Sequence, residues 1–403
     1  MKGKVIILGV TGGIAAYKAA ELLRLFMKAG ADVHVIMTKA AQRFVTPLTF
    51  QTLSGNPVHT RMFNLIDQRE IGHISLSERA DIMVVAPATA NFVGKVASGI
   101  ADDLLTTTVM ATKAPILIAP AMNTAMYHNP IYRENEEKLR RMGCHFVDPS
   151  TGMLACGWEG EGKLQELSVI FEAARTVLSP KDLCGRTVLV TAGPTREEMD
   201  PVRFFSNYSS GKMGYAVAGA ARRRGARVYL VTGPVSLSAP WGVETIAVTS
   251  AKEMREAVLR LFDSADVVIK TAAVADYRPE ERSPLKIRKG ETPLNVKLVK
   301  NPDILAELGR NKGGCFLVGF AAETGDAAES AARKLSEKNL DMVVGNDVTC
   351  DGAGFAVDTN IVKILTPDGR AEALPLMGKD ELADEILDRI VERIGQGRKE
   401  ENR

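Results

Sequence analysis

The chain alternates short apolar runs with longer stretches in which apolar residues recur every three or four positions. The first run, residues 5–8, is Val-Ile-Ile-Leu; a glycine turn and a helical pattern up to Gly30 follow, and then another apolar strand at Asp32–Met37. Uninterrupted apolar strands separated by amphipathic helices are typical of parallel sheets buried on both faces. The pattern therefore predicts a βαβ unit at the start of the chain.

The same pattern begins again near the middle of the chain. Residues 187–191 form another apolar run, and a helical pattern begins after a long polar loop. Between the two starts a helical pattern stops at Ser179 and Pro180, because a proline disfavours helix at the residue before it. We therefore predict an α/β protein made of two tandem Rossmann-like three-layer domains with mainly parallel sheets, residues 1–180 and 181–403.

Composition limits the classes of function. Lys and Arg total 51 and Asp and Glu total 49, a net charge of +2, so the chain as a whole does not attract nucleic acid or an anionic membrane. No apolar run is long enough to span a bilayer, and the N-terminal run lacks a signal-peptide cleavage site. The five cysteines are dispersed without a CxxC pair, as expected in a reducing compartment. We predict a cytoplasmic protein without nucleic-acid or membrane partners.

Glycines and small polar residues follow the first strands. The Thr11-Gly12-Gly13 turn allows backbone N–H groups and a helix N-terminus to approach a phosphate, although glycine also serves turn geometry alone. The full GxGxxG fingerprint is missing and Asp32 follows the turn too closely for ribose recognition, so a mononucleotide is favoured over a dinucleotide. Residues 87–91, Pro-Ala-Thr-Ala-Asn, follow another apolar run and suit a flat ligand above the carboxyl edge of the sheet.

Three motifs of the first half occur together in a known family: residues 72–76 (GHISL), residues 120–126 (PAMNTAM) and a glycine-rich segment around Cys156. On these motifs the first half resembles the homo-oligomeric flavin-containing cysteine decarboxylases. Over almost its whole length the chain is similar to bifunctional bacterial coenzyme A biosynthesis proteins, in which a phosphopantothenoylcysteine decarboxylase is fused to a phosphopantothenate–cysteine ligase. Tyr127 and Lys163 depart from the family's usual Trp and Arg but keep the aromatic and cationic character.

The resemblance implies a flavin reaction in the first half. FMN would accept electrons from the cysteinyl thiol of 4′-phosphopantothenoylcysteine, which lets CO₂ leave, and the product would be re-reduced to 4′-phosphopantetheine. His73 would act as the base, Asn123 would hold the substrate carboxylate, and Cys156 would donate the final proton. From the residues alone, a lone His is commonly a capping or surface residue and a lone Cys a small buried one. The residues that would contact FMN are Gly12, Gly13, Ile14, Ala15, Thr38, Pro87, Ala88, Thr89, Asn91, Ser98, Gly99, Ile100 and Ala101.

The second half carries polar residues at the corresponding strand ends. Ser209, Ser210 and Gly211 open a helix, where they serve either as an anion site or as a plain N-cap, and the spacing favours neither. Asp276 comes shortly after the predicted strand at residues 266–271. A carboxylate at such a strand end suits a metal ion or a nucleotide hydroxyl. Residues 286–289, Lys-Ile-Arg-Lys, are typical of a solvated face, and beside an anion site they suit a phosphate clamp.

The second half resembles phosphopantothenate–cysteine ligase. The resemblance implies that CTP activates the carboxylate of 4′-phosphopantothenate as an acyl-cytidylate, which the amine of cysteine attacks, while Mg²⁺ and lysines neutralise the triphosphate. Asn207 would hold the acyl-cytidylate, Lys286 would contact the phosphates and Asp276 would bind the metal. Arg288 stands where the family commonly has lysine. The residues that would bind substrate or CTP are Ser209, Ser210, Gly211, Lys270, Thr271, Ala272, Ala273, Asp276, Arg288, Lys289, Asn301, Pro302, Asp303, Ile304, Phe320, Lys334 and Lys338.

Two other hypotheses are opposed by particular residues. An NAD(P)-dependent oxidoreductase of the Rossmann type is opposed by the missing glycine fingerprint and by the PAMN stretch, residues 120–123. A non-catalytic flavoprotein acting as a regulatory subunit is opposed by His73 and Cys156, which stand on one chain with an intact ligase half. Family members of the flavin half form trimers and ligase halves form dimers, so the resemblance implies a homo-oligomer.

Overall fold

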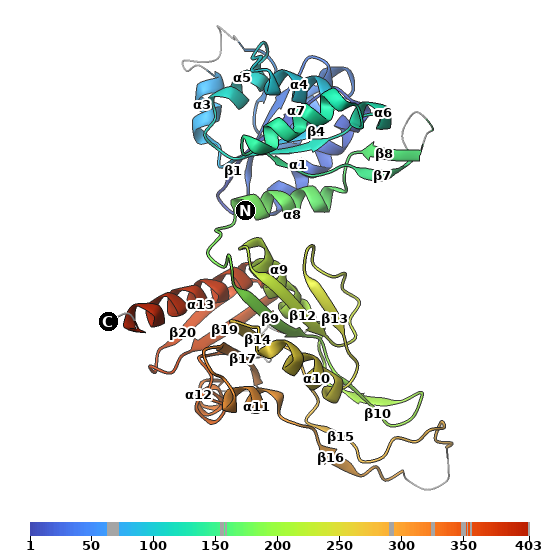
Figure 1. The fold of residues 1–403 in the computed structure, drawn as a ribbon, viewed down its shortest axis with the longest axis vertical. Helices are drawn as coiled ribbons and strands as arrows, with labels where there is room; N and C mark the ends of the chain where they lie inside the picture. The colour runs from blue at the N-terminus through green and yellow to red at the C-terminus, as the bar shows by residue number, and fades with distance from the viewer. Residues whose placement is uncertain are drawn as a thin grey trace. The chain divides into compact units, whose positions relative to one another are not determined.

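A computed structural model describes the chain apart from residues 63–71, 154–156, 158, 290–293, 324–326, 348–351, 353, 355–356 and 402–403. The chain divides into two compact units, Met1–Ser179 and Pro180–Arg403 (Figure 1). In each unit a mainly parallel sheet lies between helices, which confirms the predicted α/β fold class. Among the described residues, no helix is both long and apolar enough to cross a bilayer.

The described part of the first unit contains a parallel sheet in the order β3-β2-β1-β4-β5-β6. Its strands are β1 (Val5–Val10), β2 (Asp32–Met37), β3 (Val58–His59), β4 (Ile82–Ala88), β5 (Ile116–Pro120) and β6 (His145–Phe146). Its helices are η1 (Ile14–Tyr17), α1 (Lys18–Lys28), η2 (Ala41–Arg43), α2 (Pro47–Ser54), α3 (Gly72–Arg79), α4 (Ala90–Ala97), α5 (Leu104–Ala111), α6 (Thr124–Tyr127), α7 (Pro130–Arg141) and α8 (Leu167–Leu178). A hairpin of β7 (Ser150–Met153) and β8 (Glu159–Lys163) follows β6.

Alternating residues of β1 explain why this sheet has helices on both faces. Ile6 and Leu8 are fully buried on one face with Phe26 of α1. Ile7 is fully buried on the other face with Leu105 of α5. Successive strand residues point to opposite faces, so an uninterrupted apolar strand needs a cover on each side. The strand order reverses between β1 and β4, and the carboxyl ends of these strands form the crevice where α/β proteins bind ligands.

The second unit contains a larger sheet in the order β13-β12-β9-β14-β17-β18-β19-β20, in which β19 and β20 are antiparallel to their neighbours. Its strands are β9 (Thr187–Ala192), β12 (Arg227–Thr232), β13 (Glu244–Ala247), β14 (Val267–Lys270), β17 (Phe316–Glu323), β18 (Met342–Asp347), β19 (Thr359–Leu365) and β20 (Ala371–Gly378). Its helices are α9 (Lys212–Arg223), α10 (Ala251–Phe262), α11 (Ile304–Arg310), α12 (Ala327–Glu337) and α13 (Lys379–Glu401).

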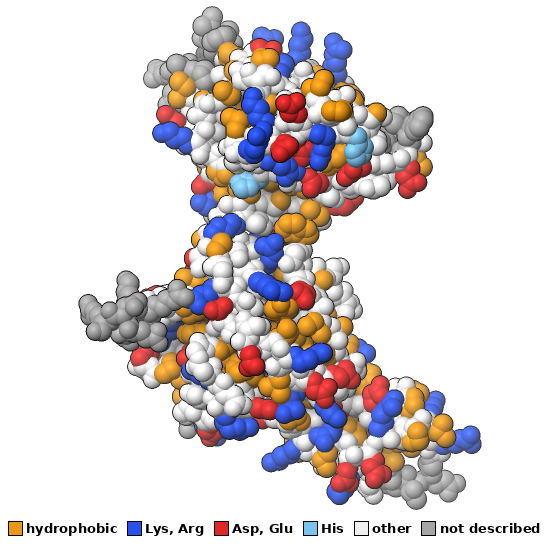
Figure 2. Space-filling view, viewed as in Figure 1, with side chains coloured by type: hydrophobic (Ala, Val, Ile, Leu, Met, Phe, Trp, Pro, Cys, Tyr) orange, Lys and Arg blue, Asp and Glu red, His pale blue; other side chains and the backbone are white. Residues whose placement is uncertain are grey.

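Two small antiparallel pairs extend from this sheet, β10 (Arg196–Glu198) with β11 (Phe204–Ser206) and β15 (Tyr277–Pro279) with β16 (Leu298–Lys300). We call the described residues of 196–206 and 277–300 the arm (Figure 1). The buried carboxylate of Asp200 accepts hydrogen bonds from the N–H groups of Val202 and Arg203 at 2.7 and 2.8 Å. It also accepts one from the N–H of Ile287 at 3.1 Å, which joins the two halves of the arm. Hydrophobic side chains lie exposed among charged ones on the arm (Figure 2), namely Val202, Phe204, Phe205, Tyr277, Leu285, Leu294 and Leu298.

Candidate functional site

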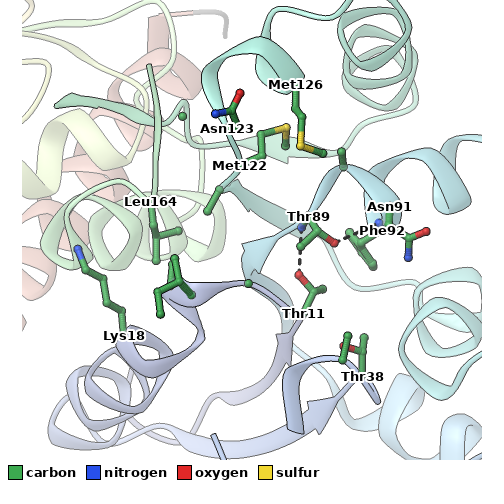
Figure 3. Close-up of a pocket in the computed structure, with 18 of the residues that line it drawn as sticks. Thr11, Lys18, Thr38, Thr89, Asn91, Phe92, Met122, Asn123, Met126 and Leu164 are labelled. Atoms are coloured by element: carbon green, nitrogen blue, oxygen red, sulfur yellow. Dashed lines mark hydrogen bonds between the residues drawn. The ribbon is translucent and has the colours of Figure 1, made fainter. Parts of the chain in front are cut away.

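A cavity of about 860 Å³ lies at the carboxyl ends of β1 and β4 in the first unit (Figure 3). The turn between β1 and η1, the loop after β2, the start of α4, the loop before α6 and strand β8 surround it. Its walls combine small residues with the apolar side chains of Phe92, Met122, Met126 and Leu164. A mostly apolar hollow with a few convergent polar groups is the usual form of a cofactor site.

Thr11 joins the two strands beneath this cavity. Its Oγ1 donates to the carbonyl oxygen of Pro87 at 2.7 Å and accepts from the N–H of Thr89 at 3.0 Å (Figure 3). Gly12 packs directly against the loop after β2, because a Cβ added to Gly12 would lie 2.3 Å from the Cβ of Ala40. No side chain fits in that space, so the glycine at this position is required by the close approach of the two loops.

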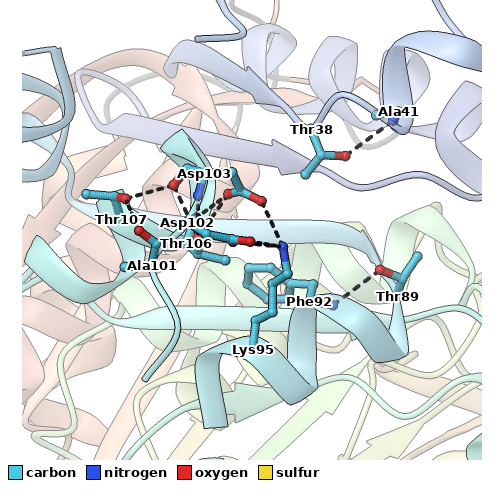
Figure 4. A network of polar contacts seen from close by, with 10 residues as sticks. All are labelled: Thr38, Ala41, Thr89, Phe92, Lys95, Ala101, Asp102, Asp103, Thr106 and Thr107. Atoms are coloured by element: carbon cyan, nitrogen blue, oxygen red, sulfur yellow. Dashed lines mark hydrogen bonds and ion pairs between the residues drawn. The ribbon is translucent and has the colours of Figure 1, made fainter. Parts of the chain in front are cut away.

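The rim next to α4 carries paired charges (Figure 4). Lys95 of α4 donates to Asp102 at 2.7 Å and lies 3.8 Å from Asp103. The hydrogen bond between Lys95 and Asp102 raises the pKa of the lysine and lowers the pKa of the carboxylate. Asp103 also forms a capping box with Thr106 at the start of α5. The charges at this rim are therefore neutralised and fixed by the protein itself.

Asn123 stands at the opposite wall as the N-cap of α6. Its side-chain Oδ1 accepts a hydrogen bond from the N–H of Ala125 at 2.9 Å. Because the oxygen is held by the helix, the amide nitrogen Nδ2 is directed away from the helix start. An oriented amide N–H₂ group at a cavity wall is a suitable donor to a carboxylate, the role that the family resemblance predicts for Asn123.

The structure gathers many of the predicted FMN contacts and leaves others apart. Of the predicted FMN contacts, Gly12, Gly13, Ile14, Ala15, Thr38, Thr89 and Asn91 line the cavity, as does the predicted catalytic residue Asn123. Pro87 and Ala88 belong to β4 beneath it. Ser98, Gly99, Ile100 and Ala101 are exposed after α4 and do not line this cavity, so their contact with FMN stays a prediction. The side chain of His73, a residue of α3, and all of Cys156 lie outside the described residues.

Other cavity residues were missed by the sequence analysis: Tyr17, Lys18, Lys39, Ala40, Phe92, Lys95, Asp103, Thr106, Met153, Gly162 and Leu164. Tyr17 and Lys18 stand one helical turn after the predicted Ile14, so helical spacing could have indicated them. Lys95 likewise follows the predicted Asn91 by four positions. Gly162 and Leu164 reach the cavity only because the β7–β8 hairpin folds back, and no local pattern indicates that return.

In the second unit, Asn207 and Asn301 bond to the backbone that follows β14. The amide nitrogen of Asn207 donates to the carbonyl oxygen of Val274 at 3.1 Å. The backbone N–H of Asn301 donates to the carbonyl oxygen of Asp276 at 2.8 Å, and its side chain donates to that of Ala275 at 2.8 Å. These bonds tie three segments that are distant in sequence into one edge, and each contributes a predicted site residue.

Three lysines and an aspartate gather beside this edge. Lys338 pairs with Asp303 at 2.8 Å, and Lys334 donates to the carbonyl oxygen of Phe320 at 3.2 Å. Burial lowers the pKa of Lys270 to about 8; nearby Asp303 opposes that shift, while Lys338 and Lys334 add to it. The predicted residues Lys270, Asp303, Lys334 and Lys338 therefore lie close together, with three positive charges against one negative charge.

A smaller cavity of about 80 Å³ lies next to the start of α9. Predicted residues line it: Ser209, Ser210, Gly211, Thr271, Ala273 and Phe320. Asn346, Asn360 and Lys379 line it as well and were missed, because they come from strands and a helix far along the chain. The Lys379 ammonium donates to the carbonyl oxygens of Gly354 and Val357, and burial lowers its pKa.

The remaining predicted residues lie at the edges of this region. Lys286, Arg288 and Lys289 are exposed on the arm, and they are not among the charges that shift the pKa of Lys270. Asp276 is an exposed single carboxylate. Within the described part of the chain, no group of three or more His, Cys, Asp or Glu residues is arranged to hold a metal ion. Ala272, Pro302 and Ile304 belong to the same strand ends and to the start of α11.

Comparison with known proteins assigns both units. A flavoprotein family model matches residues 1–179, and a model described as the DNA/pantothenate metabolism flavoprotein C-terminal domain matches residues 183–394. The coenzyme A biosynthesis bifunctional protein of Bacillus subtilis (strain 168) is 51% identical over 389 residues, which cover 96% of this chain and 96% of that protein.

Two solved structures are similar to the separate units. The crystal structure of the C-terminal domain of a coenzyme A biosynthesis bifunctional protein is 45% identical, covers 54% of this chain and 99% of its own, and has a TM-score of 0.47. A PPC decarboxylase mutant complexed with pantothenoylaminoethenethiol is 32% identical, covers 43% of this chain and 97% of its own, and has a TM-score of 0.39.

A flavoprotein domain followed by a DNA/pantothenate metabolism domain defines the class of this protein. The chain belongs to the family of coenzyme A biosynthesis bifunctional proteins. Its match to the Bacillus subtilis relative extends over nearly the full length of both chains. The predicted function is thereby confirmed: the protein is a bifunctional enzyme of coenzyme A biosynthesis, a phosphopantothenoylcysteine decarboxylase joined to a phosphopantothenate–cysteine ligase.

Proposed function

We propose that the predicted first domain, residues 1–180, binds FMN in the large cavity of the first unit and decarboxylates 4′-phosphopantothenoylcysteine there. The observation that carries this proposal is the cavity of about 860 Å³ at the β1–β4 crevice, with a glycine turn at one end and Asn123 at the other. The residues fit a flavin: the turn at Gly12 and Gly13 precedes a helical segment, as in phosphate-binding turns, and apolar side chains suit a planar ring system.

The chemistry divides among a few side chains. FMN, when bound, supplies the electron sink that the loss of CO₂ requires. The Nδ2 group of Asn123 holds the substrate carboxylate until the bond between this carboxylate and the α-carbon of the cysteinyl group breaks and CO₂ leaves. His73 acts as the base during oxidation of the cysteinyl end, and Cys156 returns a proton when the product is reduced. The reaction is redox-neutral overall, so it consumes no external oxidant.

We infer that the predicted second domain, residues 181–403, forms the amide that the first domain then processes. The carboxylate of 4′-phosphopantothenate attacks the α-phosphorus of CTP and releases pyrophosphate. The cysteine amine next attacks the acyl carbon and releases CMP. Asn207 holds the acyl-cytidylate, Lys286 contacts the phosphates in the first step, and the lysines next to Asp303 neutralise the triphosphate.

Mg²⁺ is proposed as the metal of this step, with Asp276 as its protein ligand. A magnesium ion bound to a nucleotide keeps several waters and needs only one or two carboxylates from the protein. A single exposed carboxylate next to a polar strand edge fits that requirement. A fully protein-made metal cage is not required, in keeping with its absence from the described residues.

The assembly is proposed from the family together with the surface of the arm. We propose trimeric contacts for the decarboxylase units and dimeric contacts for the ligase units, which combine into a closed homo-oligomer. The exposed hydrophobic residues of the arm support a pairing surface on the ligase unit. A cytoplasmic location is also proposed, since Cys144, Cys184 and Cys315 are free thiols in the described structure.

The test uses the purified full-length protein. An absorption spectrum with flavin bands, and release of FMN on denaturation, are expected for the decarboxylase unit. Incubation with CTP, Mg²⁺, cysteine and 4′-phosphopantothenate should then yield CMP, pyrophosphate, CO₂ and 4′-phosphopantetheine. A colourless protein that fails to bind added FMN would overturn the proposal for the first unit, and absence of CMP would overturn that for the second.

A variant separates the two halves of the flavin reaction. Cys156→Ser should retain flavin and form the oxidised, decarboxylated product, but it should not complete the final reduction, because a serine hydroxyl is a much weaker acid than a thiol. The measurement is mass spectrometry of the products from supplied 4′-phosphopantothenoylcysteine. Normal formation of 4′-phosphopantetheine would remove Cys156 from the proposed role.

A further inference from the structure

Strand β8 packs directly on the loop and helix that carry Asn123, and the two elements lie side by side (Figure 1). The backbone N–H of Met122 donates to the carbonyl oxygen of Gly162 at 2.9 Å. His128, the residue after α6, pairs with Glu161 at 3.3 Å. The strand is therefore attached to both ends of this short helical segment, and its position sets one wall of the proposed decarboxylase cavity.

Next to these two attachments, Gly160 of β8 lies against Thr124, the first residue of α6. A Cβ added to Gly160 would lie 2.5 Å from Oγ1 and 3.1 Å from Cγ2 of Thr124. The φ angle of Gly160 lies outside the positive range in which glycine is favoured. The backbone at this position would accept other residues, so the contact with Thr124 is what excludes a side chain.

The threonine side of this contact is unusual as well. Within the described structure, the Oγ1 atom of Thr124 is buried and has no hydrogen-bond partner. A buried hydroxyl without a partner is unfavourable for folding, so local stability does not account for a threonine here. Gly162 differs, because its φ of +136° and the 2.3 Å distance from its added Cβ to the carbonyl oxygen of Met122 each require glycine.

We propose that Gly160 and Thr124 are positioning residues of the decarboxylase. Their contact sets the separation of β8 from α6 and thereby fixes the wall of the cavity next to Asn123, where the substrate carboxylate is held. Met153 and Lys163 of the same hairpin line the cavity together with Asn123, so a displaced β8 moves that wall. This inference rests on the proposed function, in which the substrate binds at Asn123. A displacement of about 1 Å in such a site reduces turnover by up to about 10²-fold.

The first experiment enlarges the contact by one carbon. Gly160→Ala should push β8 away from α6, break the bond from the Met122 N–H, and speed hydrogen exchange of that amide by at least about tenfold. Decarboxylation of supplied 4′-phosphopantothenoylcysteine should fall about 10- to 100-fold, while FMN content and CMP release stay at the wild-type level. Gly94→Ala is the matched control, because its added Cβ comes no nearer than 3.8 Å to Asn135 Nδ2.

The second experiment removes the clash from the other side. The double variant Gly160→Ala/Thr124→Ala lacks Oγ1 and Cγ2, the two atoms of Thr124 that lie nearest to the added Cβ. Only the Cβ at position 124 remains, 3.3 Å from the new methyl group. Exchange at Met122 and turnover should return to within about threefold of wild type. Thr124→Val alone, which keeps the shape and removes the hydroxyl, should also stay within about threefold of wild type, because that hydroxyl makes no hydrogen bond.

Three results would overturn the proposal. In the first, Gly160→Ala shows wild-type exchange at Met122 and wild-type turnover. In the others, the double variant Gly160→Ala/Thr124→Ala or the single variant Thr124→Val is as impaired as Gly160→Ala. If Gly160→Ala does not fold, Thr124→Leu makes the same clash from α6 and takes its place. Should the wild-type enzyme itself not decarboxylate the supplied substrate, the proposed function fails instead, and exchange at Met122 still tests the contact.

Discussion

The cavity of the first unit and the polar edge of the second are built in opposite ways. The first is large, about 860 Å³, mostly apolar, and closed by loops that touch at Gly12 and Ala40. The second has a cavity of only about 80 Å³ and lies beside lysines from several elements. A resident planar cofactor is best held by a preformed apolar hollow. A triphosphate that binds and leaves in every turnover is best held by charges.

The charged groups of the two sites show the same difference. Lys95 at the first cavity is neutralised by Asp102 at 2.7 Å, and the pairing raises the pKa of the lysine. Lys270 at the second edge is half-buried near two further lysines, and its pKa is lowered to about 8. The rim of the first cavity at Lys95 is thus neutralised by the protein itself, whereas an anion bound at the second edge would offset the charge of its lysines.

The largest expected effect tests whether the two sites work independently. Asn207→Asp should lower amide formation by about 10³-fold, because a carboxylate cannot donate to the Val274 carbonyl and repels an anionic acyl-cytidylate. Decarboxylation of supplied 4′-phosphopantothenoylcysteine should not change. The measurements are pyrophosphate release and CO₂ release by the same preparation. Loss of both activities in a folded variant would show that the activities are not separated as proposed.

The next effect tests the preformed cavity. Gly12→Ala places a Cβ 2.3 Å from that of Ala40 and must force the two loops apart, a strain of about 1–3 kcal/mol. Retention of FMN should fall about 30-fold, measured as flavin absorbance per chain after dialysis. In Gly13→Ala the added Cβ comes no nearer than 3.9 Å to Thr89, so the loss should be about threefold. Equal losses in the two variants would contradict a role for this close packing.

A smaller effect tests the charged edge through pH. The ammonium form of Lys270 is present below a pH of about 8, so CMP formation should fall about tenfold between pH 7 and pH 9 if this charge holds the triphosphate. Lys270→Met should be slow at both values and lack that step. A pH profile that is unchanged in the variant would exclude Lys270 from nucleotide binding.

The same titration predicts a change in stability. The folded pKa of about 8 lies below the ordinary value of 10.5, so between these values the unfolded chain binds more protons than the folded one. The free energy of unfolding of the second unit should therefore rise with pH from about 8 to 10.5, relative to Lys270→Met. Denaturant unfolding of both proteins across this range measures the difference. A constant difference would show that Lys270 does not titrate there.

The smallest effect concerns one hydrogen bond at the first cavity. Thr38→Val removes the oxygen that accepts from the N–H of Ala41 at 3.2 Å and should weaken FMN binding about fivefold, as the loss of about 1 kcal/mol implies. Fluorescence titration of the apoprotein with FMN provides the measurement. Thr46→Val, on the exposed surface beyond η2, is the matched control and should bind FMN like the wild type. An equal change in both would place the effect outside the cavity.

The sequence predicted the sheets well because burial leaves a strong pattern. Uninterrupted apolar runs such as β1 and β4 are buried along nearly their whole length, so their composition indicates their place. The arm was not predicted, since β10, β11, β15 and β16 have only three residues each and many of them are exposed. Short exposed strands have no period that distinguishes them from loops.

The local sequence pattern likewise predicted some residues of the candidate site and not others. Gly12, Thr89 and Asn123 directly follow buried strands, and parallel strands bring their carboxyl ends to one edge, so these cavity residues were predictable. Lys379 was not, because only the folding of α13 onto the second sheet brings it to the small cavity. Ser98 was predicted as an FMN contact; it is exposed after α4 and does not line the cavity, so this contact stays a prediction.

The two outer strands of the first sheet, β3 and β6, have only two residues each. Strands this short offer almost no free ladder of N–H and C=O groups to another polypeptide. Among the described residues, the borders of this sheet therefore offer a neighbouring subunit little backbone to pair with. In the proposed assembly, contacts between decarboxylase units are expected through side chains of helices and loops, which would make the assembly sensitive to single surface substitutions.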